Sequence, residues 1–139
     1  MPLSAEVEQI ESYIYLNQQR FSHQLQIKFE ADNSLSNIRI VPLLLMTLVE
    51  NVFKYGLLSD SEQPAEILLF REDDQLCLLV ANAKSPRIHQ YSNGIGMANV
   101  EKRLEQFYPG KYDLKVYQDD LTYKLTLKIN ISNDYLLHH

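Results

Sequence analysis

Three stretches of the chain carry apolar residues at the spacing of a helix. From Val7 to Ile14 they recur at every third or fourth position, which predicts a helix over residues 4–21. The run Leu43–Tyr55 is apolar on almost every side in its N-terminal half, so it is predicted to be a buried helix. A third helix is predicted over Met97–Phe107.

The residues at the ends of these stretches support the helices. Glu6 and Glu8 fall in the first turn of the first helix, where the helix dipole favours acidic side chains. Pro42 is expected in the first turn of the second helix, because proline needs no backbone N–H there. Gly56 is placed to end that helix in a left-handed conformation, and Tyr108–Gly110 ends the third.

Elsewhere apolar residues alternate with polar ones, as in half-buried strands. Strands are predicted over Leu25–Phe29, Glu66–Arg71, Gln75–Ala81, Tyr112–Tyr117 and Leu121–Ile131. Acidic turns at Glu72–Asp74 and Asp119–Asp120 join the last four strands into two hairpins. Helices mixed with antiparallel hairpins predict an α+β fold, a two-layer α/β sandwich in which a mixed sheet packs against the helices. We find no linker and no repeat, so residues 1–139 are expected to form one domain.

Composition narrows the functional classes. The formal net charge is -5 and the basic residues are scattered, which argues against nucleic acid as a partner. No apolar run approaches the roughly 20 residues that span a bilayer, so no direct membrane insertion is expected. The single cysteine, Cys77, lies in a predicted strand and is interpreted as core filling.

The second predicted helix ends in an unusual polar group. Glu50, Asn51 and Lys54 follow an apolar run, and buried polar side chains are unfavourable unless they have partners. Their spacing brings all three toward one region of the helix surface. A carboxylate, a carboxamide and an ammonium together suit a phosphate with Mg²⁺, which takes oxygen ligands. The alternative is a surface pair of Glu50 and Lys54 with little effect on stability.

Two further segments carry candidate chemistry. Gly94 and Gly96 precede the third helix, where the backbone can approach a ligand closely and free N–H groups attract anions. They form neither a P-loop nor a dinucleotide-binding motif. Asn82 follows the apolar residues of a predicted strand, although asparagine in such a position is also a common turn former. The loop predicted over Ala83–Asn93 is long enough to be a lid.

These features occur in the order found in a known family. Val41–Gly56 resembles the N box of the ATP-binding domain of LytS-like sensor histidine kinases, in the superfamily that includes the gyrase B and MutL ATPases. Gly94–Leu104 resembles the family's second glycine box and the helix that follows it. Tyr13–Phe21 resembles the segment that enters this domain, so residues 1–24 are expected to be a helix coming from a dimerisation region outside the chain.

The resemblance implies a Bergerat-type fold that binds ATP and Mg²⁺. Asn51 would hold the Mg²⁺ between the phosphates, while Glu50 and Lys54 would act catalytically on the transferred phosphoryl group. Gly94 and Gly96 would let the lid close over the triphosphate. The residues that the resemblance assigns to nucleotide binding are Asn51, Lys54, Tyr55, Asn82, Gly94, Gly96, Met97 and Asn99.

The chain departs from the family pattern in two places. The family has an aspartate for the adenine amino group, followed by Asn-Gly or similar, where this chain has Asn82-Ala83-Lys84. Asn82 can accept a hydrogen bond through its carbonyl oxygen, but it can also flip and donate. The second departure is that none of the chain's histidines lies in a helical acceptor context; they are His23, His89, His138 and His139. The chain is therefore expected to bind ATP without phosphorylating itself.

The implied function is that of one part of a two-component system. The chain would donate the γ-phosphoryl group of ATP to a histidine outside it, on an upstream dimerisation and phosphoacceptor helix, and a response regulator of the LytTR type would follow. Its expected location is the cytoplasmic domain of a membrane-anchored bacterial kinase. Two alternatives stay open: a degenerate, non-catalytic interaction module on the same fold, and a kinase that phosphorylates a partner protein on serine.

Overall fold

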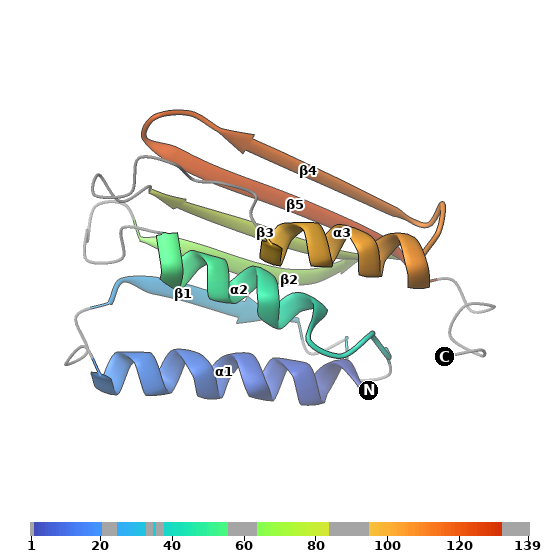
Figure 1. The fold of residues 1–139 in the computed structure, drawn as a ribbon. Helices are drawn as coiled ribbons and strands as arrows, with labels where there is room; N and C mark the ends of the chain where they lie inside the picture. Colours follow the sequence, from blue (N-terminus) through green and yellow to red (C-terminus); the bar gives the residue numbers. More distant parts are fainter. Residues whose placement is uncertain are drawn as a thin grey trace.

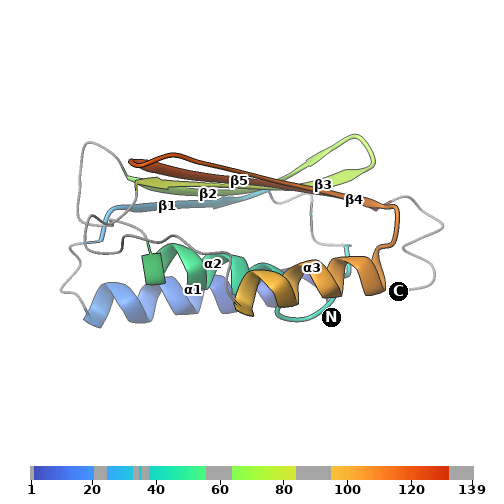
Figure 2. The ribbon, with the colours of Figure 1, turned by 45° about the horizontal axis from the view of Figure 1, so that its top comes forward.

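The computed structural model describes residues 2–20, 25–32, 35, 38–55, 64–83 and 95–131. The helices of this part are α1 (Leu3–Arg20), α2 (Leu44–Tyr55) and α3 (Ile95–Phe107). Its strands are β1 (Ile27–Ala31), β2 (Ala65–Glu72), β3 (Gln75–Ala83), β4 (Tyr112–Gln118) and β5 (Thr122–Asn130). The helices lie over one face of the sheet (Figure 1 and Figure 2), so the predicted two-layer α+β sandwich is confirmed.

The sheet contains both parallel and antiparallel pairs. Its strand order is β1-β2-β3-β5-β4. The β1–β2 pair is parallel, whereas β2–β3, β3–β5 and β4–β5 are antiparallel. A parallel pair cannot be joined by a tight turn and needs a crossover connection, which here contains α2. The mixed sheet therefore brings α2 back across the sheet between β1 and β2.

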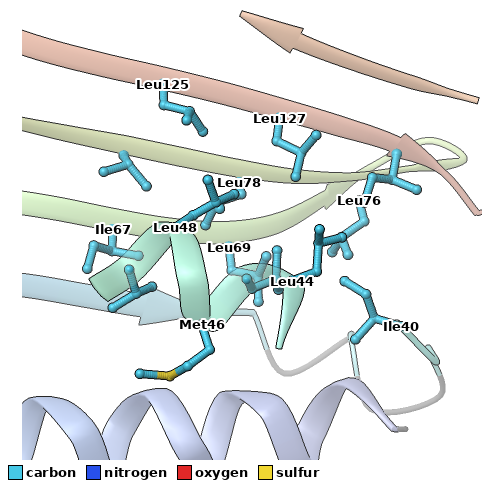
Figure 3. Packing of buried hydrophobic residues seen from close by; sticks show 14 of the residues in the cluster. Ile40, Leu44, Met46, Leu48, Ile67, Leu69, Leu76, Leu78, Leu125 and Leu127 are labelled. Carbon is cyan, nitrogen blue, oxygen red and sulfur yellow. The ribbon is translucent and has the colours of Figure 1, made fainter. Parts of the chain in front are cut away.

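The face of the sheet that meets the helices forms the core. Alternate side chains of a strand point to the same face. The buried residues on this face include Ile67, Leu69, Leu76, Leu78, Val80, Leu125, Leu127 and Ile129. Leu44 and Leu48 of α2 pack into the same cluster (Figure 3). Burial of each such side chain stabilises the fold by about 1.5–3 kcal/mol, which explains why α2 is apolar on its sheet side.

Cys77 is buried in the middle of the sheet. It lies between Phe70 of β2 and Lys128 of β5, its partners in the strand register. Its exposed fraction is 1%, and burial raises the pKa of the thiol. Cys77 is therefore buried, as expected, but it lies on the sheet face away from the helices and outside the core cluster.

Helix α2 begins one residue later than predicted. Leu43 has a φ of 66°, which places it in the left-handed region and outside a right-handed helix. Pro42 therefore lies in the turn before α2 and not in its first helical turn. Leu43 is also 51% exposed, so the apolar run that predicted the helix overstated its length by one residue.

Two strands also begin later than predicted, and side chains explain why. Gln18 of α1 donates its Nε2 to the carbonyl of Leu25 at 2.9 Å and accepts from the N–H of Leu25 at 3.3 Å. The backbone of Leu25 is thus paired with α1, and β1 begins at Ile27. Asp119 accepts hydrogen bonds from the N–H groups of Leu121 and Thr122, which keeps Leu121 in the turn before β5.

Glu6 is buried on α1 and caps the N-terminus of α2. Its exposed fraction is 0%. Its Oε1 accepts hydrogen bonds from the N–H groups of Leu45 and Met46, both at 3.1 Å. The first amides of a helix have no partner within the helix, and a carboxylate also complements the positive end of the dipole. Glu6 therefore lies in the first turn of α1, as predicted, but its carboxylate bonds to the start of a helix distant in sequence.

The turn before α2 is held from the side of α3. The hydroxyl of Tyr108 accepts a hydrogen bond from the N–H of Val41 at 3.0 Å. The guanidinium of Arg103 donates to the carbonyl of Pro42. Together with Glu6, these contacts connect the start of α2 to both neighbouring helices.

The Glu6 carboxyl predicts a specific pH dependence of stability. Burial raises its pKa above the ordinary value of 4.5, while the amides of Met46 and Leu45 and the charge of Arg103 oppose the shift. A group with a raised folded-state pKa contributes stability that is fully present below the unfolded pKa and is lost as pH rises through the folded pKa. The free energy of unfolding of the parent, relative to Glu6→Gln, should therefore fall as pH rises above 4.5. Urea unfolding of the parent and Glu6→Gln at several pH values measures this difference in free energy. Parallel pH profiles of the two proteins would contradict the prediction.

The buried hydroxyl of Tyr108 provides a second test. Tyr108→Phe removes the acceptor for the N–H of Val41 and should lower the free energy of unfolding by about 1–2 kcal/mol. Tyr117→Phe is the matched control, because Tyr117 is 62% exposed and its hydroxyl bonds only at the surface, to Asp119. Urea unfolding should show a change of no more than about 0.5 kcal/mol for the control. Equal losses in the two variants would refute the role of Tyr108.

Candidate functional site

Helix α2 lies between α1 and α3 in the helical layer (Figure 1). Its Met46 side chain extends toward α1 (Figure 3). Further along α2, the ring of Phe53 meets the ring of Tyr13 of α1 edge-on, with centroids 4.9 Å apart. Met46 and Phe53 therefore mark the flank of α2 that faces α1.

Asn51 occupies the opposite flank of α2. Residues two positions apart in a helix are separated by about 200° around the axis. Asn51 therefore points away from Phe53, toward the side on which α3 packs. Val52, between them, is buried against the sheet. The side chain of Asn51 is half-buried, which leaves part of it accessible to a ligand.

Glu50 lies on a different side of α2 from Asn51. Its side chain is exposed and lies about 100° around the helix from Asn51. Burial raises the pKa of the Tyr13 hydroxyl, and the negative charge of Glu50 raises it further, which places Glu50 on the α1 side. The backbones of Lys54 and Tyr55 complete α2, whereas their side chains lie outside the described residues.

Asn82 lies on the helical side of the sheet near the end of β3. This strand extends to Ala83, beyond the predicted end at Ala81. Asn82 pairs with Tyr123 of β5 and is 5% exposed. Its Nδ2 donates a hydrogen bond to the carbonyl of Ala83 at 2.9 Å. That bond fixes the orientation of the carboxamide and directs its oxygen, an acceptor, away from the Ala83 carbonyl.

The end of the sheet at Asn82 is hollowed. A pocket of about 400 Å³ opens there, lined by Pro64, Glu66, Ala81, Asn82, Ala83, Tyr117, Thr122, Tyr123 and Lys124. Burial raises the pKa of Tyr123 to about 12, so its phenol is neutral at physiological pH. Because alternate side chains of a strand point to opposite faces, Ala81, Ala83 and Lys124 line this pocket from the face away from the helices, whereas Asn82 and Tyr123 face the helices.

Helix α3 begins beside α2 and brings further predicted residues to the same region. It starts at Ile95, earlier than the predicted start at Met97, so Gly96 lies in its first turn. Asn99 is exposed, whereas the Met97 side chain is 3% exposed and belongs to the core. A nucleotide contact by Met97 would therefore involve its backbone. Gly94 lies outside the described residues.

The C-terminal half of α2, the end of β3 and the start of α3 form one region (Figure 1). It combines the half-buried carboxamide of Asn51, the buried carboxamide of Asn82 and the first amides of α3, which have no partner within the helix. In the described part of the chain, no three His, Cys, Asp or Glu side chains gather to hold a metal. A metal at Asn51 would accordingly take most of its ligands from a bound phosphate group and water, as Mg²⁺ commonly does.

A second hollow, of about 500 Å³, lies between α1 and β1. Its lining consists of Leu3, Ser4, Val7, Glu8, Glu11, Phe29, Ala31, Asp32 and Leu35. The carboxylates of Glu8, Glu11 and Asp32 would repel a polyphosphate. The region around Asn51 and Asn82 is therefore the better candidate for an anionic ligand.

Curated proteins similar to this chain are sensor kinases, although no protein-family model matches it. The chain is 29% identical to the sensor protein LytS of Enterococcus faecalis over 75% of its length. It is 30% identical to LytS of Oceanobacillus iheyensis over 75% of its length, and 29% identical to the sensor histidine kinase BtsS of Escherichia coli over 91%. The chain spans only 16%, 20% and 23% of these three proteins.

Solved structures show the same fold. The catalytic domain of histidine kinase ThkA superposes with a TM-score of 0.66 at 13% identity, covering 97% of this chain and 96% of that one. The histidine kinase AdeS of Acinetobacter baumannii gives a TM-score of 0.58 at 15% identity, over 96% of this chain and 66% of that one. The predicted resemblance to LytS-like sensor histidine kinases is confirmed. Within the described residues of this LytS-like chain, no helix is long and apolar enough to cross a membrane.

Sequence reasoning missed the residues that hold the LytS-like N-box helix α2 in place. Glu6, Arg103 and Tyr108 all bond to its start or to the turn before it. One signal for Glu6 was available, because it lies on the same helical stripe as the buried residues Leu3 and Ile10. An acidic residue on a buried stripe needs a partner, and here the partner is a helix N-terminus.

Proposed function

We propose that this chain is the ATP-binding catalytic domain of a sensor histidine kinase, which donates the γ-phosphoryl group of ATP to a histidine outside the chain. The observation that carries the proposal is the position of Asn51. It is half-buried in the C-terminal half of α2, in the region that also contains the end of β3 and the start of α3 (Figure 1). Similarity to LytS and BtsS supports the same function, and their greater length leaves room for a phosphoacceptor outside this chain.

The residues of this region fit ATP with Mg²⁺. The carboxamide oxygen of Asn51 is a hard ligand of the kind that Mg²⁺ prefers. The first amides of α3, including that of Gly96, suit the negative charge of phosphates. When bound, Mg²⁺ and ATP supply the transferable phosphoryl group and neutralise its charge. The protein contributes mainly by positioning, because phosphoryl transfer requires little covalent chemistry from side chains.

Asn82 would recognise adenine. The adenine amino group needs an acceptor, and the bond from Asn82 Nδ2 to the Ala83 carbonyl favours the orientation in which the carboxamide presents oxygen. The neutral side chain thereby replaces the aspartate of the family pattern without its charge. This arrangement supports a working variant of the site over a degenerate one.

Glu50 and Lys54 are proposed to act on the transferred group. Glu50 is exposed, so a histidine approaching from outside the chain could reach it. Lys54 would contact the phosphates as a point charge from the end of α2. Tyr55, Gly94, Met97 and Asn99 complete the proposed nucleotide contacts.

The proposed partners follow from this function. They are the dimerisation and phosphoacceptor helix of the same kinase and a response regulator of the LytTR type. The chain would form the cytoplasmic part of a membrane-anchored bacterial kinase, where ATP is available.

Calorimetry with ATP, with and without Mg²⁺, tests the proposal directly. The parent should bind ATP saturably, with affinity raised by Mg²⁺, and Asn51→Ala should lose the Mg²⁺-dependent part while its circular dichroism stays unchanged. Asn130→Ala is the control, because Asn130 is half-buried at the opposite end of the sheet. Absence of binding by the parent at millimolar ATP would favour the non-catalytic interaction module, and full MgATP binding by Asn51→Ala would remove Asn51 from the metal site.

The adenine assignment predicts a change in base selectivity. Asn82→Asp should increase the preference for ATP over GTP, because a carboxylate accepts from the adenine amino group and cannot donate to guanine. Asn17→Asp makes the same chemical change on α1, where the amide of Asn17 also donates to a backbone carbonyl, that of Tyr13. Competition binding of ATP and GTP measures both variants. Equal discrimination in the parent and Asn82→Asp would exclude Asn82 from the base pocket.

A further inference from the structure

Helix α1 contacts the proposed nucleotide-binding helix α2 at both of its ends. At the N-terminal end, the carboxylate of Glu6 accepts from the N–H groups of Leu45 and Met46, each at 3.1 Å. At the C-terminal end, Tyr13 meets Phe53 edge-on with ring centroids 4.9 Å apart. The two contacts lie on either side of Asn51 along the chain.

Contacts at two ends constrain a helix more than one contact can. The Glu6 bonds fix the position of α2 along its axis, while the ring contact at Phe53 fixes its rotation about that axis. Asn51 lies on the opposite flank from Phe53, so a rotation of α2 would displace the Asn51 carboxamide across the site.

The Glu6 side chain has few alternatives to its bonds with α2. It is fully buried, and its second oxygen, Oε2, has no hydrogen-bond partner among the described residues. If α1 moved away, the amides of Leu45 and Met46 would lose their acceptor in a buried environment. Such groups are unfavourable without partners, so α2 would adjust together with α1.

We propose that Glu6 and Tyr13 are positioning residues of the nucleotide site, through which α1 sets the affinity for MgATP. The inference rests on the proposed function, because Asn51 must hold the Mg²⁺–nucleotide for its position to matter. It identifies α1 as the element whose displacement by another part of a kinase would lower nucleotide affinity without any contact to the nucleotide.

Two substitutions at Glu6 test the inference, because one removes the hydrogen-bond acceptor for the α2 amides and the other retains it. Glu6→Ala removes the cap and should weaken MgATP binding about tenfold, a usual size for coupling between sites. Glu6→Gln keeps an oxygen for the amides and should restore binding to within about twofold of the parent, because the acceptor is retained. Glu8→Ala, an exposed change on the same helix, is the control and should bind as the parent does. Calorimetry gives the affinities, and the ¹⁵N amide signals of Leu45 and Met46 should shift in Glu6→Ala and remain close to the parent in Glu6→Gln.

Tyr13→Leu tests the second contact and covers the case in which Glu6→Ala does not fold. It keeps apolar bulk against Phe53 but loses the edge-on ring contact, and it should weaken MgATP binding about fivefold with the Glu6 cap intact. If Glu6→Ala folds and binds MgATP as tightly as the parent, the inference is overturned and the proposed function stands. If Glu6→Ala does not fold, the same result for Tyr13→Leu overturns the inference. Failure of the parent itself to bind MgATP would instead overturn the proposed function, and the inference with it.

Discussion

A buried carboxylate at the N-terminus of a buried helix is the contact on which this structure depends most. Glu6 joins α1 to α2, and α2 supplies both the centre of the core and the Asn51 side chain. The turn before α2 is also held by Arg103 and Tyr108 from the other side. These polar contacts orient an apolar helix that could otherwise slide on the sheet, since hydrophobic burial is not directional.

The proposed site combines residues from elements that differ in rigidity. Asn82 belongs to β3, which is paired on both sides and is therefore rigid. Asn51 belongs to α2, whose position depends on side-chain contacts with α1 and α3. The proposed adenine recognition at Asn82 and the proposed metal binding at Asn51 would thus depend on separate parts of the structure, and only the second would depend on the position of α1.

Most of the fold could be predicted from the sequence, because the helices and strands have strong apolar periodicity. The missed boundaries have local causes in side-chain bonds or backbone conformation, as at Leu25, Leu43 and Leu121. The proposed roles of Asn51 and Asn82 are implied by the family resemblance alone, whereas the separation of Glu50 from Asn51 follows from helical geometry. The apolar stripe that contains Glu6 could have indicated that it is buried, but not its partner, because the cap joins residues 39 positions apart and periodicity describes only local neighbours.

The parallel pairing of β1 with β2 has a consequence for the order of folding. The β2–β3 and β4–β5 pairs are hairpins with short turns, so their strands can meet early and at little entropic cost. Strand β1 reaches β2 only after the chain has crossed the sheet through α2, and such distant contacts form slowly. The N-terminal unit of α1 and β1 should therefore join last during folding. The same unit should open first during partial unfolding, with the hairpins still intact.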